Sequence, residues 1–118
     1  MKTIFILEDE DSIRDLLNVF FSIEGYKIIE AATISDFNRL YSTDRVDLFI
    51  LDVRLPDGSG IDVCNTLKSN PIEAPVLMMS AHAKTFEIEK KCQPDAYISK
   101  PFDLDDLLAW VHSFIGPA

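Results

Sequence analysis

Short apolar runs alternate with amphipathic stretches along the chain. Five runs rich in β-branched and aromatic residues predict strands, at residues 3–7, 26–31, 46–51, 76–79 and 96–98. Apolar residues recur at helical spacing after four of these runs and predict helices that begin near Asp11 or Ser12, Thr33 or Ser35, Ser59 and Asp103. Residues 82–93 are polar and only weakly periodic, so they predict a fourth helix that is short or mobile.

The alternation of buried strands with helices predicts an α/β fold, a doubly wound five-stranded parallel sheet with right-handed crossovers and helices on both faces. With the strand order 2-1-3-4-5, this is a flavodoxin-like three-layer α/β/α architecture in which the second strand is an edge. The length of 118 residues fits one hydrophobic core, so we expect a single domain over residues 1–118.

Composition narrows the classes of function. No apolar run approaches the roughly 20 residues of a membrane span, and no signal-peptide pattern opens the chain. A formal net charge of −9 repels nucleic acid and anionic membranes, so we expect no direct nucleic-acid binding. Cys64 and Cys92 fit no metal-ligand spacing and are interpreted as reduced thiols of a cytoplasmic protein.

Potentially reactive side chains follow four of the predicted strands. The first strand is followed by Glu8 and Asp9, the third by Asp52, the fourth by Ser80, and the last by Lys100. The carboxyl ends of parallel strands meet at one edge of the sheet, where sites form in open α/β folds. With strands one, three, four and five contiguous, these side chains should line one pocket.

Three carboxylates and one cation in one pocket suit phosphoryl chemistry. Clustered carboxylates raise one another's pKa unless a cation neutralises them, and Mg²⁺ prefers such oxygen ligands. Asp52 could then attack a phosphorus centre and form an aspartyl-phosphate. Ser80 and Lys100 could contact the phosphoryl oxygens.

Four motifs, in order, carry a resemblance to a known family. They are Ile-Leu-Glu-Asp-Glu after the first strand, Leu-Asp-Val-Arg-Leu-Pro-Asp-Gly-Ser-Gly around Asp52, Ser-Ala at residues 80–81, and Ser-Lys-Pro-Phe at residues 99–102. Over essentially its whole length the chain resembles a response-regulator receiver domain of two-component signalling, with a chemotaxis-Y-like fold. The resemblance implies a phosphorelay function.

The resemblance implies a role for each pocket residue. Asp52 would accept a phosphoryl group from the phosphohistidine of a sensor histidine kinase or a phosphotransfer protein, so that the domain catalyses its own phosphorylation and autodephosphorylation. Asp9, Asp52 and the backbone carbonyl of Arg54 would bind Mg²⁺, or Mn²⁺ in its place, and Glu8 would act directly or through water. Lys100 would contact the phosphoryl oxygens.

The resemblance also implies which residues respond to phosphorylation and which residues set the lifetime of the phosphoryl group. Ser80 would shift toward the phosphate and Tyr97 would rotate inward, which remodels the face formed by the fourth helix, fifth strand and fifth helix. The bond before Pro101 is cis in this family. Arg54 and His82 occupy the positions that tune phosphoryl lifetime, and we hypothesise that Arg54 hinders attacking water.

This output face is the least regular part of the resemblance. The segment between Ser80 and Lys100 is shorter than usual in the family, and residues 93–96 depart from the customary sequence before Tyr97. Trp110 and Phe114 lie off the main apolar stripe of the last helix and favour either a partner surface or simple packing. The face could serve an output domain, a target protein or a phosphorylation-dependent homodimer. The chain is either a free-standing receiver or the N-terminal part of a longer transcriptional regulator.

Other functions compete with this hypothesis. Asp52 could be a helix cap, or the chain a degenerate docking module that is never phosphorylated. A haloacid-dehalogenase-type phosphatase also uses an aspartate nucleophile and Mg²⁺, but it needs a second aspartate where Arg54 stands. A flavin-binding module shares the strand order, but residues 8–11, all acidic, would repel its phosphate.

Overall fold

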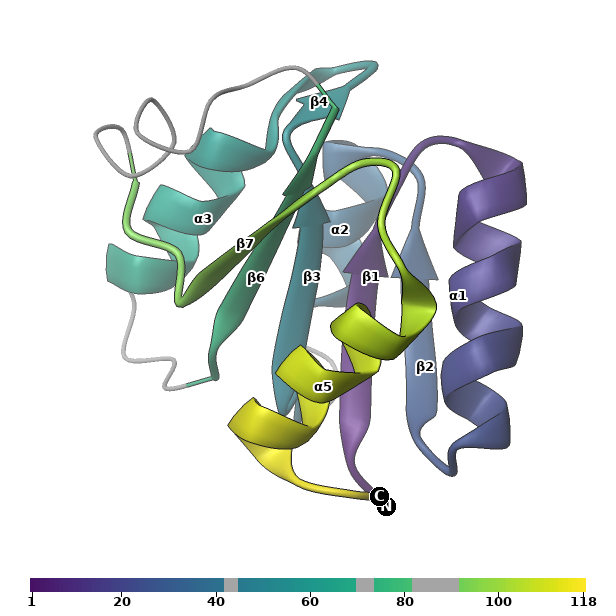
Figure 1. Cartoon of the computed structure of the whole chain (residues 1–118). Coiled ribbons are helices and arrows are strands. Elements are labelled where there is room, and N and C mark those ends of the chain that lie inside the picture. Colours follow the sequence, from purple (N-terminus) through teal and green to yellow (C-terminus); the bar gives the residue numbers. More distant parts are fainter. Residues whose placement is uncertain (42–44, 70–73, 82–91) are drawn as a thin grey trace.

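A parallel sheet with helices on both faces forms the centre of the molecule (Figure 1). This computed structural model describes residues 1–41, 45–69, 74–81 and 92–118. Along the described chain the elements are β1 (Thr3–Leu7), α1 (Asp11–Ile23), β2 (Lys27–Ala31), α2 (Ile34–Leu40), β3 (Leu48–Asp52), β4 (Arg54–Leu55), β5 (Gly58–Ser59), α3 (Gly60–Ser69), β6 (Val76–Ser80), β7 (Ala96–Ser99) and α5 (Leu104–Ile115).

The strand order of the main sheet is β2-β1-β3-β6-β7, with every neighbouring pair parallel. This confirms the predicted order 2-1-3-4-5 and the α/β class. The register places Leu7 beside Leu51, Asp52 beside Met79, and Ser80 beside Ser99. The carboxyl ends of β1, β3, β6 and β7 therefore lie next to one another.

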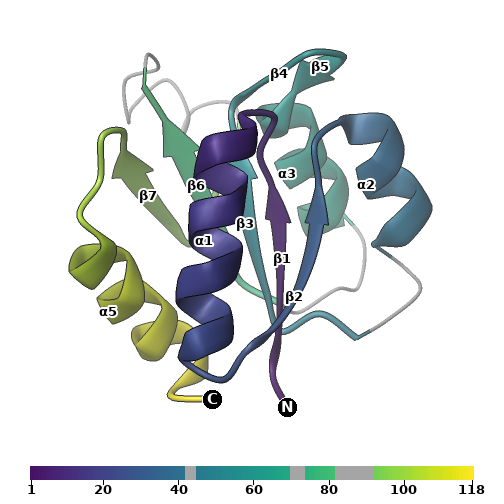
Figure 2. The ribbon, with the colours of Figure 1, turned by 90° about the vertical axis from the view of Figure 1, so that its right-hand side faces the viewer.

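The three central strands are buried along their whole length, which explains their continuous apolar sequences. On one face, Phe5, Phe37 and Phe49 pack in a cluster with side chains of α3. On the other face, α1 and α5 cover a second cluster that contains Phe21 and Leu107 (Figure 2). No helix in the described ranges is long and apolar enough to cross a membrane.

Three of the four described helices start with the expected capping chemistry, including α3, where the Ser59 hydroxyl accepts a hydrogen bond from the Ile61 N–H. The Thr33 side chain accepts a hydrogen bond from the Asp36 N–H and caps α2, and Asp103 caps α5 in the same way through the Asp105 N–H. The prediction for α1 was wrong by one residue or two, because Glu10 is its N-cap and makes no side-chain cap. Gly25 follows the C-cap of α1 and has a φ of 99°, a conformation that favours glycine.

The loop after β3 contains a small antiparallel hairpin that the sequence pattern did not predict. Arg54 pairs with Ser59 across strands β4 and β5, and Asp57 lies in the turn between them. The Asp57 carboxylate accepts hydrogen bonds from the Ile34 and Ser35 N–H groups, at 2.8 and 3.0 Å. These two hydrogen bonds hold the hairpin that follows β3 against the start of α2. Most of the helix predicted at residues 82–93 lies outside the described residues.

Candidate functional site

Backbone hydrogen bonds hold the strand ends that carry the predicted reactive residues. The Glu8 N–H donates to the Ala31 carbonyl at 3.1 Å, so the chain follows the sheet one residue beyond β1. On the other side, the Lys100 N–H donates to the Ser80 carbonyl at 3.0 Å. Asp52 is the last residue of β3, between these two segments. The side chains are therefore presented from a rigid edge rather than from free loops.

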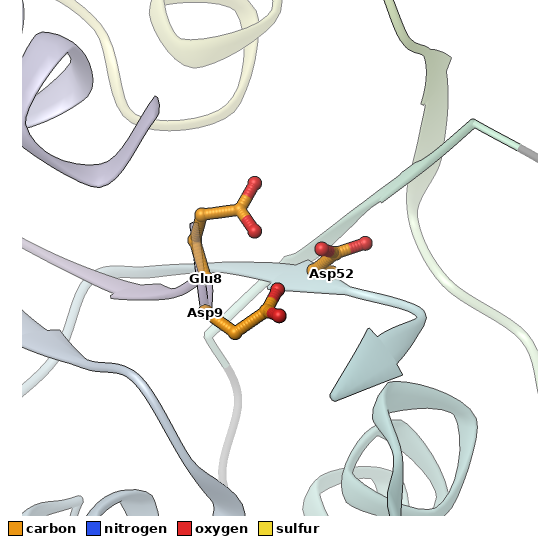
Figure 3. Close-up of side chains that lie close together, drawn as sticks. All are labelled: Glu8, Asp9 and Asp52. Carbon is orange, nitrogen blue, oxygen red and sulfur yellow. The ribbon is translucent and has the colours of Figure 1, made fainter. Parts of the chain in front are cut away.

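Three carboxylates meet at this edge. Glu8, Asp9 and Asp52 each offer one oxygen within 4.8 Å of the others, and their side chains point toward one another (Figure 3). Glu8 is fully buried and Asp52 nearly so, whereas Asp9 is exposed. Such a set of hard oxygen donors, open to solvent on the side of Asp9, fits Mg²⁺, which keeps part of its water shell.

Lys100 is the cation among these carboxylates. Its Nζ donates to Glu8 Oε1 at 2.5 Å and to Asp52 Oδ2 at 3.0 Å. Burial by itself would lower the pKa of Lys100, but the hydrogen bonds to Glu8 and Asp52 outweigh it and raise that pKa. The ammonium group therefore stays charged and ties β7 to β1 and β3.

The Glu8 carboxyl is harder to ionise than an ordinary glutamate. Burial, followed by the hydrogen bond and charge of Asp52, raises the pKa of Glu8 to about 7, although Lys100 acts in the opposite direction. The Glu10 N–H also donates to Glu8 Oε2, at 3.3 Å. Near neutral pH, the metal-free site therefore holds a proton on Glu8 in part of the molecules.

Magnesium affinity should consequently depend on pH. A proton on Glu8 opposes cation binding, so the dissociation constant for Mg²⁺ should fall as pH rises through about 7 and level off above about 8. Isothermal titration with MgCl₂ at several pH values measures this. Glu8→Gln should remove the dependence in that range. An equally steep dependence in Glu8→Gln would show that another group takes up the proton.

A pocket of about 330 Å³ opens above Asp52. Its lining residues are Asp9, Glu10, Asp52, Arg54, Ser80, Ala81 and Lys100. Glu8 is not among them, because its side chain lies beneath Lys100 with no exposed surface. Glu8 therefore contacts the site through Lys100, and the pocket leaves free space beside Asp52.

The remaining predicted residues are placed as follows. Ser80 is buried at the end of β6 and lines the pocket, and the exposed Arg54 lines it from the hairpin. The Lys100–Pro101 peptide bond is cis. Tyr97 is half-buried on β7, packs against the core cluster on the α3 side and does not line the pocket. His82 lies outside the described residues.

Sequence reasoning missed three residues that support the site. Arg14 on α1 contacts the backbone of the acidic segment, Asp57 links the loop after β3 to α2, and Gly60 lies against the Asp52 carbonyl. The spacing of Arg14 from Asp11 was a readable signal for an i, i+3 ion pair. The other two contacts cross between elements and leave no local pattern.

Comparison with known proteins identifies the class. A sequence profile of the response regulator receiver domain matches residues 4–112. The chain is 32% identical over 116 residues to the alkaline phosphatase synthesis transcriptional regulatory protein PhoP of Bacillus subtilis, covering 97% of this chain and 48% of that protein. It is 31% identical over 106 residues to the regulatory protein AtoC of Escherichia coli, covering 88% of this chain and 23% of that protein. The chain thus spans half or less of these relatives.

Comparison with solved structures leads to the same class of protein. A CheY-like receiver domain protein from Methanospirillum hungatei has a TM-score of 0.86 at 27% identity, with 96% of this chain and 92% of that chain covered. The response regulator TrrA of Thermotoga maritima, solved in complex with Mg²⁺ and BeF, has a TM-score of 0.86 at 27% identity, with 98% and 100% covered. The molecule is an open parallel α/β protein with an acidic pocket at its strand ends. The chain belongs to the response regulator receiver domains of two-component signalling.

Proposed function

We propose that the chain is phosphorylated on Asp52 by a phosphohistidine donor in a Mg²⁺-dependent reaction. The observation that supports this best is the arrangement around Asp52, whose carboxylate bonds to Lys100, lies beside Glu8 and Asp9, and lines an open pocket. Receiver domains as a class interact with histidine kinases or phosphotransfer proteins. In this chain, we assign the transfer of the phosphoryl group to Asp52 and the residues around it.

The chemistry follows from the positions of the side chains. An Asp52 carboxylate oxygen forms the new P–O bond while the P–N bond of phosphohistidine breaks, and the electron pair of that bond stays on the imidazole. Lys100, already bonded to Asp52, is placed to pair with a phosphoryl oxygen, and Ser80 to donate to another. Asp9, Asp52 and the Arg54 carbonyl would hold Mg²⁺, or Mn²⁺, which when bound neutralises charge on the carboxylates and the phosphoryl group.

Phosphorylation would be transmitted through Ser80 and Tyr97 to the surface of β7 and α5. The Ser99 hydroxyl donates to the Tyr97 hydroxyl at 3.4 Å, which leaves the tyrosine ring at the edge of the sheet. On α5, Trp110 and Phe114 stack with ring centroids 5.8 Å apart, and Trp110 is 40% exposed. We propose this surface for an output domain, a target protein or a phosphorylation-dependent homodimer.

The cellular setting is proposed from the relatives. PhoP is named a transcriptional regulatory protein, and this chain matches 48% of its length. We propose that residues 1–118 form one receiver domain that works in the cytoplasm, either free-standing or within a transcriptional regulator. With a net charge of −9, the domain itself would not bind DNA.

Incubation with acetyl phosphate and Mg²⁺ tests the proposed function. The intact mass should increase by one phosphoryl group, and either Asp52→Ala or an excess of EDTA should abolish the increase. Asp62→Ala is a matched control, because Asp62 is an exposed carboxylate on α3 that does not line the pocket. No gain in the wild-type chain would favour a docking module, and repeated turnover of a phosphate ester would favour a phosphatase.

Arg54 should control how long the phosphoryl group persists. Its exposed side chain lines the pocket mouth, where it can block the approach of water to phosphorus. Arg54→Ala should therefore speed the loss of the phosphoryl group from Asp52 several-fold, on the order of 1 kcal/mol in the barrier. Decay of the phosphorylated mass after removal of acetyl phosphate measures it. An unchanged decay rate would refute this role.

A further inference from the structure

A single arginine holds the backbone of the acidic segment that follows β1. The Arg14 guanidinium donates through one nitrogen, Nη1, to the Glu8 carbonyl at 3.0 Å and to the Asp9 carbonyl at 3.5 Å. The backbone N–H of Arg14 donates to the next carbonyl, that of Glu10, at 3.0 Å. One residue of α1 thus binds three successive carbonyl groups of the segment.

The guanidinium is itself held from two sides. Arg14 Nη2 pairs with Asp11 Oδ1 at 2.5 Å, and Nε lies 3.9 Å from Glu30 Oε1 on β2. Asn18 donates to the other Glu30 oxygen, Oε2, at 3.0 Å. The Arg14 side chain is only 15% exposed, so the guanidinium is packed in place, whereas Asp11 is 83% exposed and its ion pair with Arg14 is screened by water and salt.

We propose that Arg14 is a positioning residue for metal binding. The inference rests on the proposed function, because it takes Asp9 and Asp52 as ligands of Mg²⁺. Glu10 makes no side-chain cap to α1, so the first turn of this helix lacks the hydrogen bond that an N-cap side chain usually supplies. Arg14 constrains the acidic segment by drawing the carbonyls toward α1, while the Glu8 and Asp9 carboxylates point toward Asp52 (Figure 3).

Charge adds to the geometric effect. Residues 8–11 are all acidic, and their mutual repulsion opposes a fixed conformation of the segment. Among these residues, Lys100 neutralises Glu8 from inside the pocket, and Arg14 pairs with Asp11 from outside it. The two cations therefore act on opposite sides of the segment: Lys100 contacts the buried carboxylates of Glu8 and Asp52, whereas Arg14 contacts the backbone carbonyls of Glu8 and Asp9.

Titration with MgCl₂ tests the role of Arg14 directly. Loss of an interaction that orients metal ligands typically weakens metal binding by about tenfold or more, so Arg14→Met should raise the dissociation constant for Mg²⁺ by about that factor. Arg39→Met is the matched control. Arg39 pairs with Asp36 on α2 in the same i, i+3 spacing and is 68% exposed, so its loss should leave Mg²⁺ binding unchanged.

Two further readouts separate positioning from a general loss of stability. At saturating Mg²⁺, Arg14→Met should regain most of its rate of phosphorylation by acetyl phosphate, because the reacting groups are intact. Arg14→Lys, which keeps the charge but not the planar fork, should weaken Mg²⁺ binding by an intermediate factor.

Several outcomes would overturn the role of Arg14. One is that folded Arg14→Met binds Mg²⁺ as tightly as Arg39→Met does. If Arg14→Met does not fold, wild-type affinity in Arg14→Lys overturns the role instead. The proposed function fails separately, if the wild-type chain gains no phosphoryl group.

Discussion

Replacing Lys100 with methionine is expected to lower the free energy of unfolding of the metal-free protein by about 3 kcal/mol near pH 8. Lys100 pairs at 2.5 and 3.0 Å with two carboxylates, Glu8 and Asp52, whose side chains are almost completely buried. Removal of the ammonium group leaves these carboxylates next to each other without a cation. An uncompensated buried charge costs far more than an exposed ion pair contributes.

The loss of unfolding free energy in Lys100→Met should increase as the pH rises. Without Lys100, the pKa of Glu8 rises further, because the hydrogen bond and charge that lower it are gone. When the pKa of a carboxyl is higher in the folded state than in the unfolded state, the free energy of unfolding falls as the pH rises from the lower pKa to the higher one. Lys100→Met should therefore be much closer to wild type near pH 5, where the Glu8 carboxyl is protonated.

Urea unfolding in EDTA at about pH 5 and pH 8, followed by circular dichroism, measures the loss of unfolding free energy and its dependence on pH. Lys68→Met is the matched control, since Lys68 pairs with Asp95 at 2.5 Å but both side chains are about one-third exposed. That change should cost less than about 1 kcal/mol at either pH. Equal midpoints for Lys100→Met and Lys68→Met at both pH values would show that Lys100 does not compensate the buried carboxylates.

The same substitution should affect phosphorylation. Removal of one preorganised donor to a developing negative charge typically lowers a rate by about 10²–10³-fold. We expect a loss of that size in the rate with acetyl phosphate, even at saturating Mg²⁺. The contrast with Arg14→Met is informative, because Arg14 contacts only the backbone of the acidic segment at Glu8 and Asp9, and its effect should disappear when Mg²⁺ saturates the site.

The strands were predictable because burial on both faces leaves little choice of sequence. β1 lies at residues 3–7 as predicted, and all of its residues are buried. The third strand was predicted at residues 46–51 but lies at Leu48–Asp52, so Asp52 belongs to the strand rather than following it. The error arose because a carboxylate does not look like a strand residue, although its backbone stays in the sheet.

The convergence of the pocket residues was predictable for a topological reason. Once the strand order is known, residues that follow contiguous parallel strands must share an edge, and Glu8, Asp52 and Lys100 are in contact there. The order of burial within the pocket was not predictable. Glu8 and Asp9 are adjacent in sequence, yet one is fully buried and the other exposed, because the chain still follows the sheet at Glu8 and bends at Asp9.

The contacts between separate elements could not be predicted from the sequence. Asp57 accepts hydrogen bonds from the first turn of α2 although it lies in a different loop. Gly60 belongs to the motif that surrounds Asp52 in the sequence, and it is the point at which α3 touches the strand that carries Asp52.

Replacing Gly60 with alanine should therefore cost at least about 3 kcal/mol of unfolding free energy and lower the melting temperature by more than about 10 °C. A Cβ atom at this position would lie 1.9 Å from the Asp52 carbonyl oxygen and 2.9 Å from its carbon. Neither atom can move cheaply, because β3 is paired with β1 on one side and β6 on the other. The helix must move instead, which breaks the 2.8 Å hydrogen bond from the Gly60 N–H to the Val53 carbonyl.

Gly25→Ala separates this clash from the general cost of losing a glycine. Gly25 has a φ of 99°, and its added Cβ would meet only the Ala118 side chain, at 3.1 Å. Strain of that kind costs about 1–2 kcal/mol. Thermal unfolding of both variants measures the difference, and equal losses would mean that α3 can retreat from β3 without cost. If α3 cannot retreat fully, part of the clash must be relieved at the Asp52 carbonyl, so Gly60→Ala should also slow phosphorylation of the folded fraction.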